Sequence, residues 1–198
     1  MKLFKSSQSD RSAGLDRRGF LRVSGGVAAG LVLGFHAPSV DAAAGAGGEA
    51  AFTPFIRIAP DGVVTVLSKH LDKGQGTLSG LASLVAEELD ADWEQMRGEH
   101  APADASRYGN AMFGGVQGTG GSTGMPSSYM LYREAGATAR AMLIAAAAKE
   151  WGAPAGEITI EKGVLSHASG KTGGFGDFAA AAAEMEPPAE VVVKAAED

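Results

Sequence analysis

Residues 55–101 read FIRIAPDGVVTVLSKHLDKGQGTLSGLASLVAEELDADWEQMRGEHA, and this stretch decides the fold. Its first part contains two short β-rich runs, residues 55–59 and 63–68, on either side of Pro60-Asp61-Gly62. Proline, aspartate and glycine in this order are typical of a tight turn between paired strands. The stretch therefore begins with a predicted β-hairpin.

A helix and a third strand follow the hairpin. After a glycine-rich turn at residues 74–76, apolar residues recur at helical spacing from Leu78 to Leu89. Residues 96–101 again have the composition of a strand. The order strand, strand, helix, strand predicts a sheet with a helix packed on it.

The second half of the chain adds another main helix. Residues 102–124 are irregular and rich in glycine, and a loop of this length is typically functional or disordered. The helix at about 126–151 places one set of apolar residues on a single face, namely Leu131, Ala135, Ala139, Met142 and Ala146. The remaining predicted elements are a hairpin at 158–167, a helix at 178–185 and a strand at 191–193. We predict an α+β fold in which a mixed β-sheet is packed by two main helices.

The first 42 residues have the parts of an export signal in the usual order. A basic segment contains Arg17-Arg18 within DRRGFLR, which matches the twin-arginine pattern of Tat signals. The apolar stretch 23–35 is shorter than the roughly 18 to 20 residues that a membrane span requires. Val40-Asp41-Ala42 then offers small residues to a signal peptidase. These features predict a signal peptide at residues 1–42 and Tat export to the periplasm.

The sequence after the signal is long enough for one domain, predicted at residues 55–198 after a linker at 43–54. The chain has formal net charge −6, and its first 42 residues hold six basic and three acidic residues, so the remainder carries −9. This charge argues against a nucleic-acid partner. The chain contains no cysteine, so it has no disulfide and cannot itself ligate an iron–sulfur cluster.

Two glycine-rich loops precede the two main helices. Gly74-Gln75-Gly76-Thr77 opens the first helix, and residues 118–124, GTGGSTG, open the second. The start of a helix leaves backbone N–H groups unpaired and carries partial positive charge, and glycines let an anion approach it closely. Glycines before helices mostly serve turns and caps, and neither loop has a named phosphate-binding spacing. Two such loops on one sheet nevertheless predict convergence on one phosphorylated ligand.

An ordered set of motifs resembles the molybdenum hydroxylases. The motifs are Asp61-Gly62-Val63-Val64-Thr65-Val66, Gly74-Gln75-Gly76, Ala86-Glu87-Glu88-Leu89, His100-Ala101-Pro102-Ala103-Asp104 and Gly120-Gly121-Ser122-Thr123. The chain is most similar to the large, molybdopterin-binding subunit of the isoquinoline 1-oxidoreductase and aldehyde dehydrogenase branch, signal included. It departs from that branch at Lys73, where the family has methionine, and in length, because such subunits run to several hundred residues.

The resemblance implies the N-terminal part of a molybdopterin-binding domain, from an exported oxidoreductase that hydroxylates an aldehyde or an N-heterocycle. It implies a molybdopterin cofactor, in the cytosine dinucleotide form, with molybdenum and shared with segments outside this chain. The implied cofactor contacts are Gly74, Gln75, Gly76, Gly121, Ser122 and Thr123. The family's general base lies beyond the matched region, so we assign no catalytic and no metal-ligating residue and expect no catalysis by this chain alone.

The resemblance also implies partners. They are the remainder of the large subunit, a small 2Fe-2S subunit, a c-type cytochrome as electron acceptor, and the Tat translocase. A fragment, a split subunit and a decayed gene are all consistent with the length of the chain.

Two other functions remain open. Residues 120–124 also fit GxSxG, the nucleophile elbow of α/β-hydrolases. Glu157 or Glu161, and then His167, follow in the order that a hydrolase triad requires. The elbow must follow a buried strand, however, and residues 110–117 do not have a strand pattern. The second alternative is an exported, non-catalytic α+β binding module.

Three other features receive structural interpretations. His70 and His100 are interpreted as surface or strand-end residues, because no two histidines have metal-ligand spacing. Glu87-Glu88 is interpreted as part of a solvated face.

The twin-arginine assignment makes a direct prediction about export. Replacing Arg17 and Arg18 by lysine should leave the precursor in the cytoplasm, with no processed form beginning near Ala43. Cell fractionation and N-terminal sequencing measure this result. Normal periplasmic accumulation of the double variant would contradict the Tat assignment.

Overall fold

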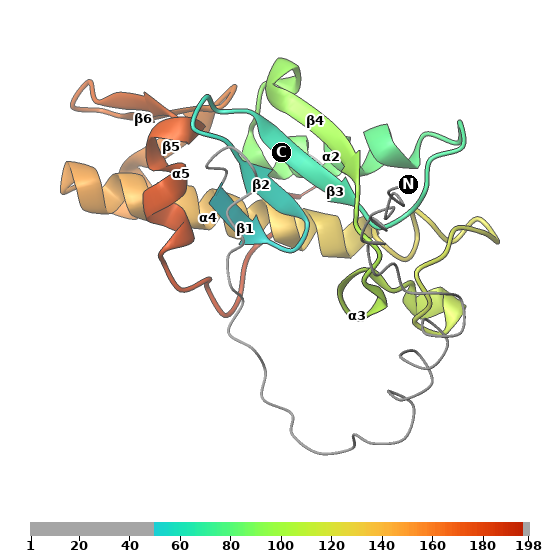
Figure 1. Ribbon diagram of the computed structural model, residues 1–198. Coiled ribbons are helices and arrows are strands. Elements are labelled where there is room, and N and C mark those ends of the chain that lie inside the picture. Colours follow the sequence, from blue (N-terminus) through green and yellow to red (C-terminus); the bar gives the residue numbers. More distant parts are fainter. Residues whose placement is uncertain (1–49, 196–198) are drawn as a thin grey trace, which may run out of the picture. The chain divides into compact units, whose positions relative to one another are not determined.

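Two β-sheets packed with helices make up the part of the chain that the computed structural model describes, residues 50–195 (Figure 1). The first sheet has the strand order β1 (Ala50–Thr53), β2 (Ile56–Ile58), β3 (Val64–Ser68), β4 (Met96–His100). The β1–β2 and β2–β3 pairs are antiparallel and β3–β4 is parallel, so the sheet is mixed. The predicted α+β class is confirmed, whereas the predicted signal peptide lies outside the described residues.

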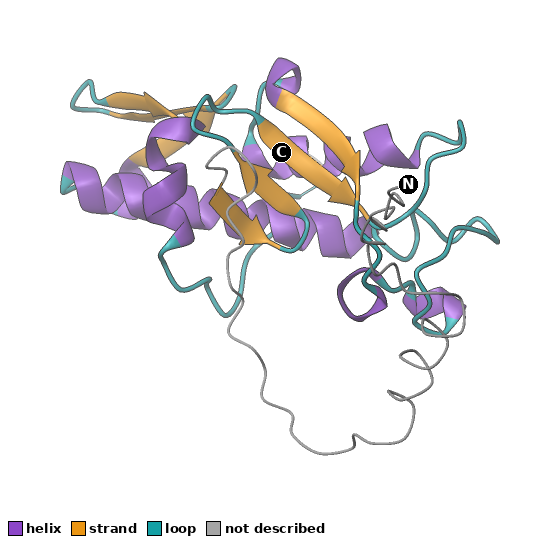
Figure 2. Ribbon diagram, in the orientation of Figure 1, coloured by secondary structure: helices purple, strands orange, loops and turns teal. Residues whose placement is uncertain are grey.

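The parallel pair is joined by α2 (Thr77–Leu89), which crosses over between β3 and β4. A parallel pair requires such a crossover, because the chain must return to its starting edge before the second strand begins. Both strands consequently end at the same edge of the sheet, and the loops that follow them start there (Figure 2). This topology brings residues 69–76 close to the long loop at 101–128.

The second main helix, α4 (Tyr129–Trp151), packs against α2 and runs in the same direction. Gly124, before α4, lies against Thr77 at the start of α2, and Gly136 within α4 lies against Glu88 near the end of α2. Contacts that follow the same order in both segments show that they run parallel. A Cβ atom at Gly136 would lie 2.8 Å from the Glu88 Cβ, so this contact requires glycine. The parallel packing brings the first turns of both helices to the same side of the sheet.

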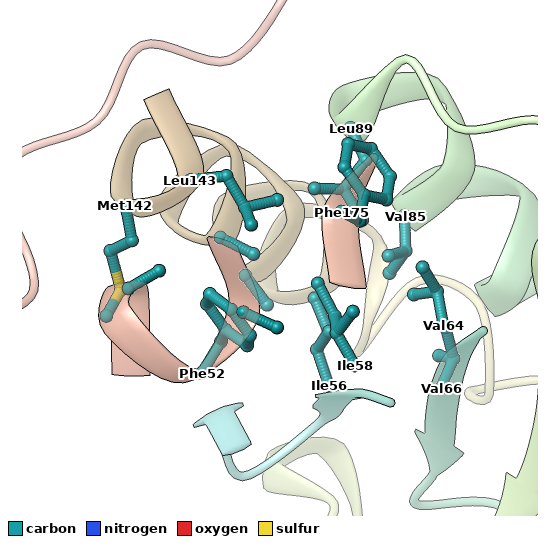
Figure 3. Close-up of a cluster of buried hydrophobic side chains, with 14 of the residues drawn as sticks. Phe52, Ile56, Ile58, Val64, Val66, Val85, Leu89, Met142, Leu143 and Phe175 are labelled. Carbon is teal, nitrogen blue, oxygen red and sulfur yellow. The ribbon is translucent and has the colours of Figure 1, made fainter. Parts of the chain in front are cut away.

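The main core lies between the first sheet and the helices, and Figure 3 shows side chains from β1–β3, α2, α4 and α5 (Phe175–Ala183) pointing toward one another. Ile56, Ile58 and Leu143 are fully buried in it. The predicted apolar face of the long helix is confirmed for four residues, Ala135, Ala139, Met142 and Ala146. Leu131 is only partly buried.

The linker predicted at residues 43–54 is wrong for its last part. Residues 50–53 form β1, which pairs with β2, and Phe52 is buried in the core. The short run AAFT has little β pattern of its own, so only its pairing with β2 and the burial of one phenylalanine make it a strand.

The second sheet is an antiparallel meander of β5 (Ile158–Glu161), β6 (Val164–His167) and β7 (Thr172–Gly174). The predicted hairpin is confirmed as β5–β6. Four short elements complete the described chain: η1 (Trp93–Gln95), α3 (Ala105–Tyr108), η2 (Ala111–Phe113) and η3 (Ala155–Glu157). Within residues 50–195, no helix has the length and apolar character needed to cross a membrane.

The strand predicted at residues 191–193 is wrong, and so is the solvated-face interpretation of Glu88. Glu88 is fully buried, and its Oε1 accepts a hydrogen bond from the Arg133 Nε at 2.7 Å. The backbone of Lys194 completes the pair, because its N–H donates to Glu88 Oε2 at 3.0 Å and its carbonyl accepts from Arg133. Side chains from α2 and α4 that bond to the Lys194 backbone, and not strand pairing, therefore hold the segment after residue 190.

The glycine contact between α2 and α4 predicts a large effect of a small substitution. Gly136→Ala should lower the free energy of unfolding by about 1 to 3 kcal/mol, because the added methyl group overlaps Glu88. Gly156→Ala is the matched control, since a Cβ there meets nothing within 4 Å. Urea unfolding followed by circular dichroism measures both. Equal stability of the two variants would show that the helices are not in tight contact.

Candidate functional site

The loops that open α2 and α4 meet at one cavity of about 500 Å³. It lies at the carboxyl ends of β3 and β4, the edge at which open α/β sheets commonly bind ligands. Its wall contains Lys73, Gln75, Thr77, Thr119, Gly120, Ser122, Thr123, Gly124 and Met125. Lys73 is the single charged residue among them, so the predicted convergence of the two glycine loops produces a cavity suited to an anion.

The first loop depends on glycine for its backbone. Gly74 has φ 100° and Gly76 has φ 78°, values in the left-handed region that favours glycine. Gly76 is also the residue that caps the start of α2. These two glycines shape the turn, and the cavity wall itself is formed by their neighbours Lys73 and Gln75.

Asp72 already occupies the anion position at the start of α2. Its Oδ2 accepts from the Leu78 N–H at 2.8 Å, and its Oδ1 accepts from Gly74 at 2.8 Å and Gly76 at 3.3 Å. These donors, that of Leu78 first, lower the pKa of Asp72. The N–H groups of Gly74, Gly76 and Leu78 are therefore used within the protein and are not directed at a ligand.

The Gln75 amide is also bonded within the turn. Its Nε2 donates to the Leu71 carbonyl at 2.7 Å and to Thr77 Oγ1 at 3.0 Å, and its Oε1 accepts from the Lys73 N–H at 2.6 Å. Gln75 lies in the cavity wall, but it stabilises the turn with the same atoms that were expected to contact a cofactor.

The second loop differs because its N–H groups are open. Gly121 and Ser122 both have positive φ, 57° and 56°, and the Thr123 N–H donates to the Gly120 carbonyl at 3.1 Å, which matches a type I′ turn. Within residues 50–195, the N–H groups of Gly120, Gly121, Ser122 and Gly124 have no hydrogen-bond acceptor. Successive open N–H groups of this kind form a concave site for an anion.

His70 holds the second loop in place, which the sequence did not indicate. It lies just after β3 and is buried, with Nδ1 3.2 Å from the Gly118 carbonyl and Nε2 3.1 Å from Ser128 Oγ. Because a carbonyl only accepts, Nδ1 carries the proton and Nε2 accepts from serine. Burial lowers the pKa of His70, and the nearby Lys69 lowers it further. The strand-end position was predicted correctly, but surface exposure was wrong.

Asn110 gives the loop a second internal support. It is fully buried, its Nδ2 donates to Thr123 Oγ1 at 2.8 Å, and its Oδ1 accepts from the Met112 N–H at 3.0 Å. The only sequence signal for such a role was an asparagine within a glycine-rich segment. His70 and Asn110 therefore fix the loop from two sides.

The nucleophile elbow is not supported by the structure. The residues before Gly120 are irregular, whereas the elbow must follow a buried strand. His167 does not line the cavity that contains Ser122, and its two ring nitrogens lie 3.0 Å from Glu157 Oε2 and 2.8 Å from Ser169 Oγ. Within residues 50–195, no group of three or more potential ligands could hold a metal ion.

Comparisons with known proteins point to one kind of domain. The sequence profile of a family described as a molybdopterin cofactor-binding domain matches residues 13–196. The beta subunit of isoquinoline 1-oxidoreductase from Brevundimonas diminuta is 38% identical over 160 residues, which are 77% of this chain and 20% of that protein. Membrane-bound aldehyde dehydrogenase (pyrroloquinoline-quinone) of Gluconacetobacter polyoxogenes is 34% identical over 177 residues, 85% of this chain and 21% of that protein.

Two further matches cover less. One of the subunits of nicotinate dehydrogenase from Pseudomonas putida is 34% identical over 125 residues, 63% of this chain and 10% of that protein. The crystal structure of quinoline 2-oxidoreductase from Pseudomonas putida 86 covers 68% of this chain and 17% of that one, at 24% identity. Its TM-score of 0.36 is too low to support an argument. The chain spans about a fifth of the length of the first two relatives.

The Asp72 cap predicts a pH-dependent contribution to stability. Because the folded pKa of Asp72 lies below its ordinary value of 3.8, the contribution is complete above pH 3.8 and is lost as the pH falls through the folded pKa. Asp72→Asn should therefore be less stable than the wild type at pH 6, and the difference should shrink below pH 3.8. Urea unfolding at several pH values measures it, with Glu150→Gln as the control. A difference that does not change with pH would contradict the cap.

Proposed function

Because the chain belongs to the family of molybdopterin cofactor-binding domains of the xanthine dehydrogenase type of molybdenum hydroxylases, we propose that the cavity between its two glycine loops binds the phosphate-bearing part of molybdopterin. The observation that supports this most is the set of open N–H groups at Gly120, Gly121, Ser122 and Gly124. Glycines in this set leave space for a phosphate to approach the backbone, and no carboxylate lines the cavity.

The described residues fit such a group unequally. The second loop offers unbonded N–H donors, and Lys73 lines the same cavity. The first loop offers the surface of Gln75, but the N–H groups of Gly74 and Gly76 serve Asp72. Of the six residues inferred from the resemblance, Gly121 and Ser122 are therefore proposed as contacts through their open N–H groups. Gln75 and Thr123 are proposed as wall residues, because their polar side-chain atoms are bonded within the protein. Gly74 and Gly76 are proposed to set the backbone of the first turn.

The chemistry of the bound group would be two-electron oxidation of a carbon–hydrogen bond at molybdenum. The residues of this chain would bind and orient the cofactor. They would keep its phosphate in contact with the loop at residues 118–124, which precedes α4. The dinucleotide form is part of the proposal, because the cavity of about 500 Å³ has room for more than one phosphate. No residue of this chain is proposed to move a proton.

We propose further that the whole protein is an oxidoreductase acting on an aldehyde or an N-heterocycle, as the names of the relatives suggest for them. The chain corresponds to about a fifth of two of them, so the remaining cofactor contacts would come from other segments. We also propose that a small 2Fe-2S subunit accepts the electrons, because this chain has no cysteine with which to ligate a cluster itself. Export by the Tat route to the periplasm, and a c-type cytochrome as acceptor, belong to the same proposal.

A chimera tests the cofactor proposal. Residues of this chain replace the aligned segment in the beta subunit of isoquinoline 1-oxidoreductase from Brevundimonas diminuta, and the molybdenum and pterin contents of the chimera are measured. We expect the chimera to retain both. Gly121→Val in the chimera should lower cofactor content about tenfold, because a β-branched residue disfavours φ 57° and distorts the set of open N–H groups.

Gly152→Val is the matched control, because Gly152 also has positive φ, 63°, but caps the far end of α4. It should cost stability and leave cofactor content unchanged. If Gly121→Val folds and keeps its cofactor, the loop has only a structural role. A folded chimera that holds neither molybdenum nor pterin would favour the non-catalytic binding module.

A further inference from the structure

Strand β4 forms an outer edge of the first sheet, because the strand order places it beyond β3 (Figure 1). It pairs with β3 in one unbroken register over five residues. In the opposite edge strand, β1, the register shifts between Ala51 and Thr53. Bulges and prolines are features by which proteins protect sheet edges, and β4 contains neither. The β4 edge is therefore able to pair with another strand.

The backbone of β4 presents hydrogen-bonding groups along this edge. The N–H of Ala101, the residue after β4, donates to the Ser68 carbonyl at 2.8 Å. Because alternate residues of a strand direct their backbone groups to the same side, those of Gly98 and His100 point away from β3. Within residues 50–195, the N–H groups of these two residues have no other acceptor. Both residues are exposed, so a second strand can reach them.

Gly98 keeps the centre of the edge free of side-chain bulk. A Cβ atom there would lie 2.8 Å from Leu78 Cγ, so α2 packs closely behind this point of the strand. Leu78, Trp93, Met96 and Gly98 also line a small cavity of about 160 Å³, and Trp93 is 55% exposed. A strand added at this edge would thus cover apolar surface while it pairs with the open backbone groups.

The charges on either side of Gly98 are opposite in sign. Arg97 precedes it, Glu99 follows it, and both residues are exposed. Arg97 Nη1 donates to two backbone carbonyls, and no carboxylate of residues 50–195 lies within ion-pair distance of the Arg97 guanidinium. Glu99 Oε2 accepts from Arg57 at 2.6 Å, and the Glu99 side chain is 57% exposed. Arg97 therefore lacks an acidic partner, and Glu99 remains accessible to another cation.

An antiparallel pair of β4 strands from two copies makes use of this order of charges. When Gly98 lies opposite Gly98, Arg97 of each copy lies opposite Glu99 of the other. Only shifts by two residues keep the outward backbone groups aligned, and they place Arg97 opposite Arg97 or Glu99 opposite Glu99. Directly opposite side chains stabilise a strand pair when their charges differ and destabilise it when their charges are alike. The sequence of β4 therefore fits one register of self-pairing.

We propose that β4 is a docking surface for a second copy of this chain, in which the two β4 strands pair antiparallel about a two-fold axis at Gly98. The two Gly98 residues exchange N–H···O=C bonds, and Arg97 and Glu99 face each other in the closer, non-hydrogen-bonded pairs beside them. A two-fold contact of this kind closes with two copies. The pairing does not depend on the cofactor proposal, because no residue of β4 lines the cavity between the two glycine loops.

Sedimentation velocity of the whole chain at increasing concentration tests the pairing. We expect a weak monomer–dimer equilibrium, because the interface is one short strand pair. Amide hydrogen exchange should slow at Gly98 as the dimer forms, since its N–H gains an acceptor. Arg97→Glu should weaken dimerisation about tenfold or more, because it places like charges opposite each other twice. Lys149→Glu makes the same change of charge at an exposed position of α4 and should alter dimerisation less than twofold.

Mixing two variants makes the test specific for this register. Arg97→Glu and Glu99→Arg each carry like charges at both positions, so each alone should be mainly monomeric where the wild type pairs. Their equimolar mixture restores opposite charges in both pairs and should dimerise as the wild type does. The proposal is overturned if the wild type is monomeric at every concentration, or if it dimerises without slower exchange at Gly98. It is also overturned if the two folded variants do not pair when mixed.

Discussion

The close, parallel contact of α2 with α4 at Gly136 is the constraint on which the rest of the structure depends. Without a Cβ at that position, the helices approach until Glu88 and Val85 lie directly against the α4 backbone. The direction of α2 is set by the crossover between the parallel strands β3 and β4, and α4 packs alongside it in the same direction. Both helix starts, and the loops before them, therefore lie at one edge of the sheet. Two positive helix ends side by side repel each other, and the carboxylate of Asp72 partly compensates this charge.

The two glycine loops look alike in sequence but differ in chemistry. In the first, an aspartate two residues before Gly74 takes the N–H groups that glycine would otherwise present to a ligand. In the second, the positive φ of Gly121 and Ser122 turns the chain so that its N–H groups stay open. A glycine-rich helix start is thus an anion site only if no nearby carboxylate fills it, and the family motif alone does not reveal which case applies.

Elements with strong local patterns could be predicted from the sequence. The Pro60-Asp61-Gly62 hairpin, the helical period of α2 and the long apolar face of α4 all carry their structure in neighbouring residues. The features that were missed depend on contacts between distant segments. Burial of Phe52 helps to make AAFT a strand. Buried Glu88 bonds to Arg133, and buried His70 bonds to Gly118 and Ser128. These partners lie far apart in the sequence, so no local pattern reveals them. The two loops do line one cavity, as expected from the topology, whereas the phosphorylated ligand between them stays a prediction.

The anchoring of residue 194 has a consequence for how this chain can vary. Glu88 accepts its N–H and Arg133 donates to its carbonyl, so the pair recognises the main chain of whatever residue stands there. The ion pair of the Lys194 side chain with Asp90, at 2.5 Å, is the only part of the anchor that depends on residue type. Substitutions at this position should therefore preserve these two bonds as long as the peptide nitrogen keeps its hydrogen, and proline is the one common residue that removes it. Helix α2 and the distant end of the chain can stay joined while the sequence between them drifts.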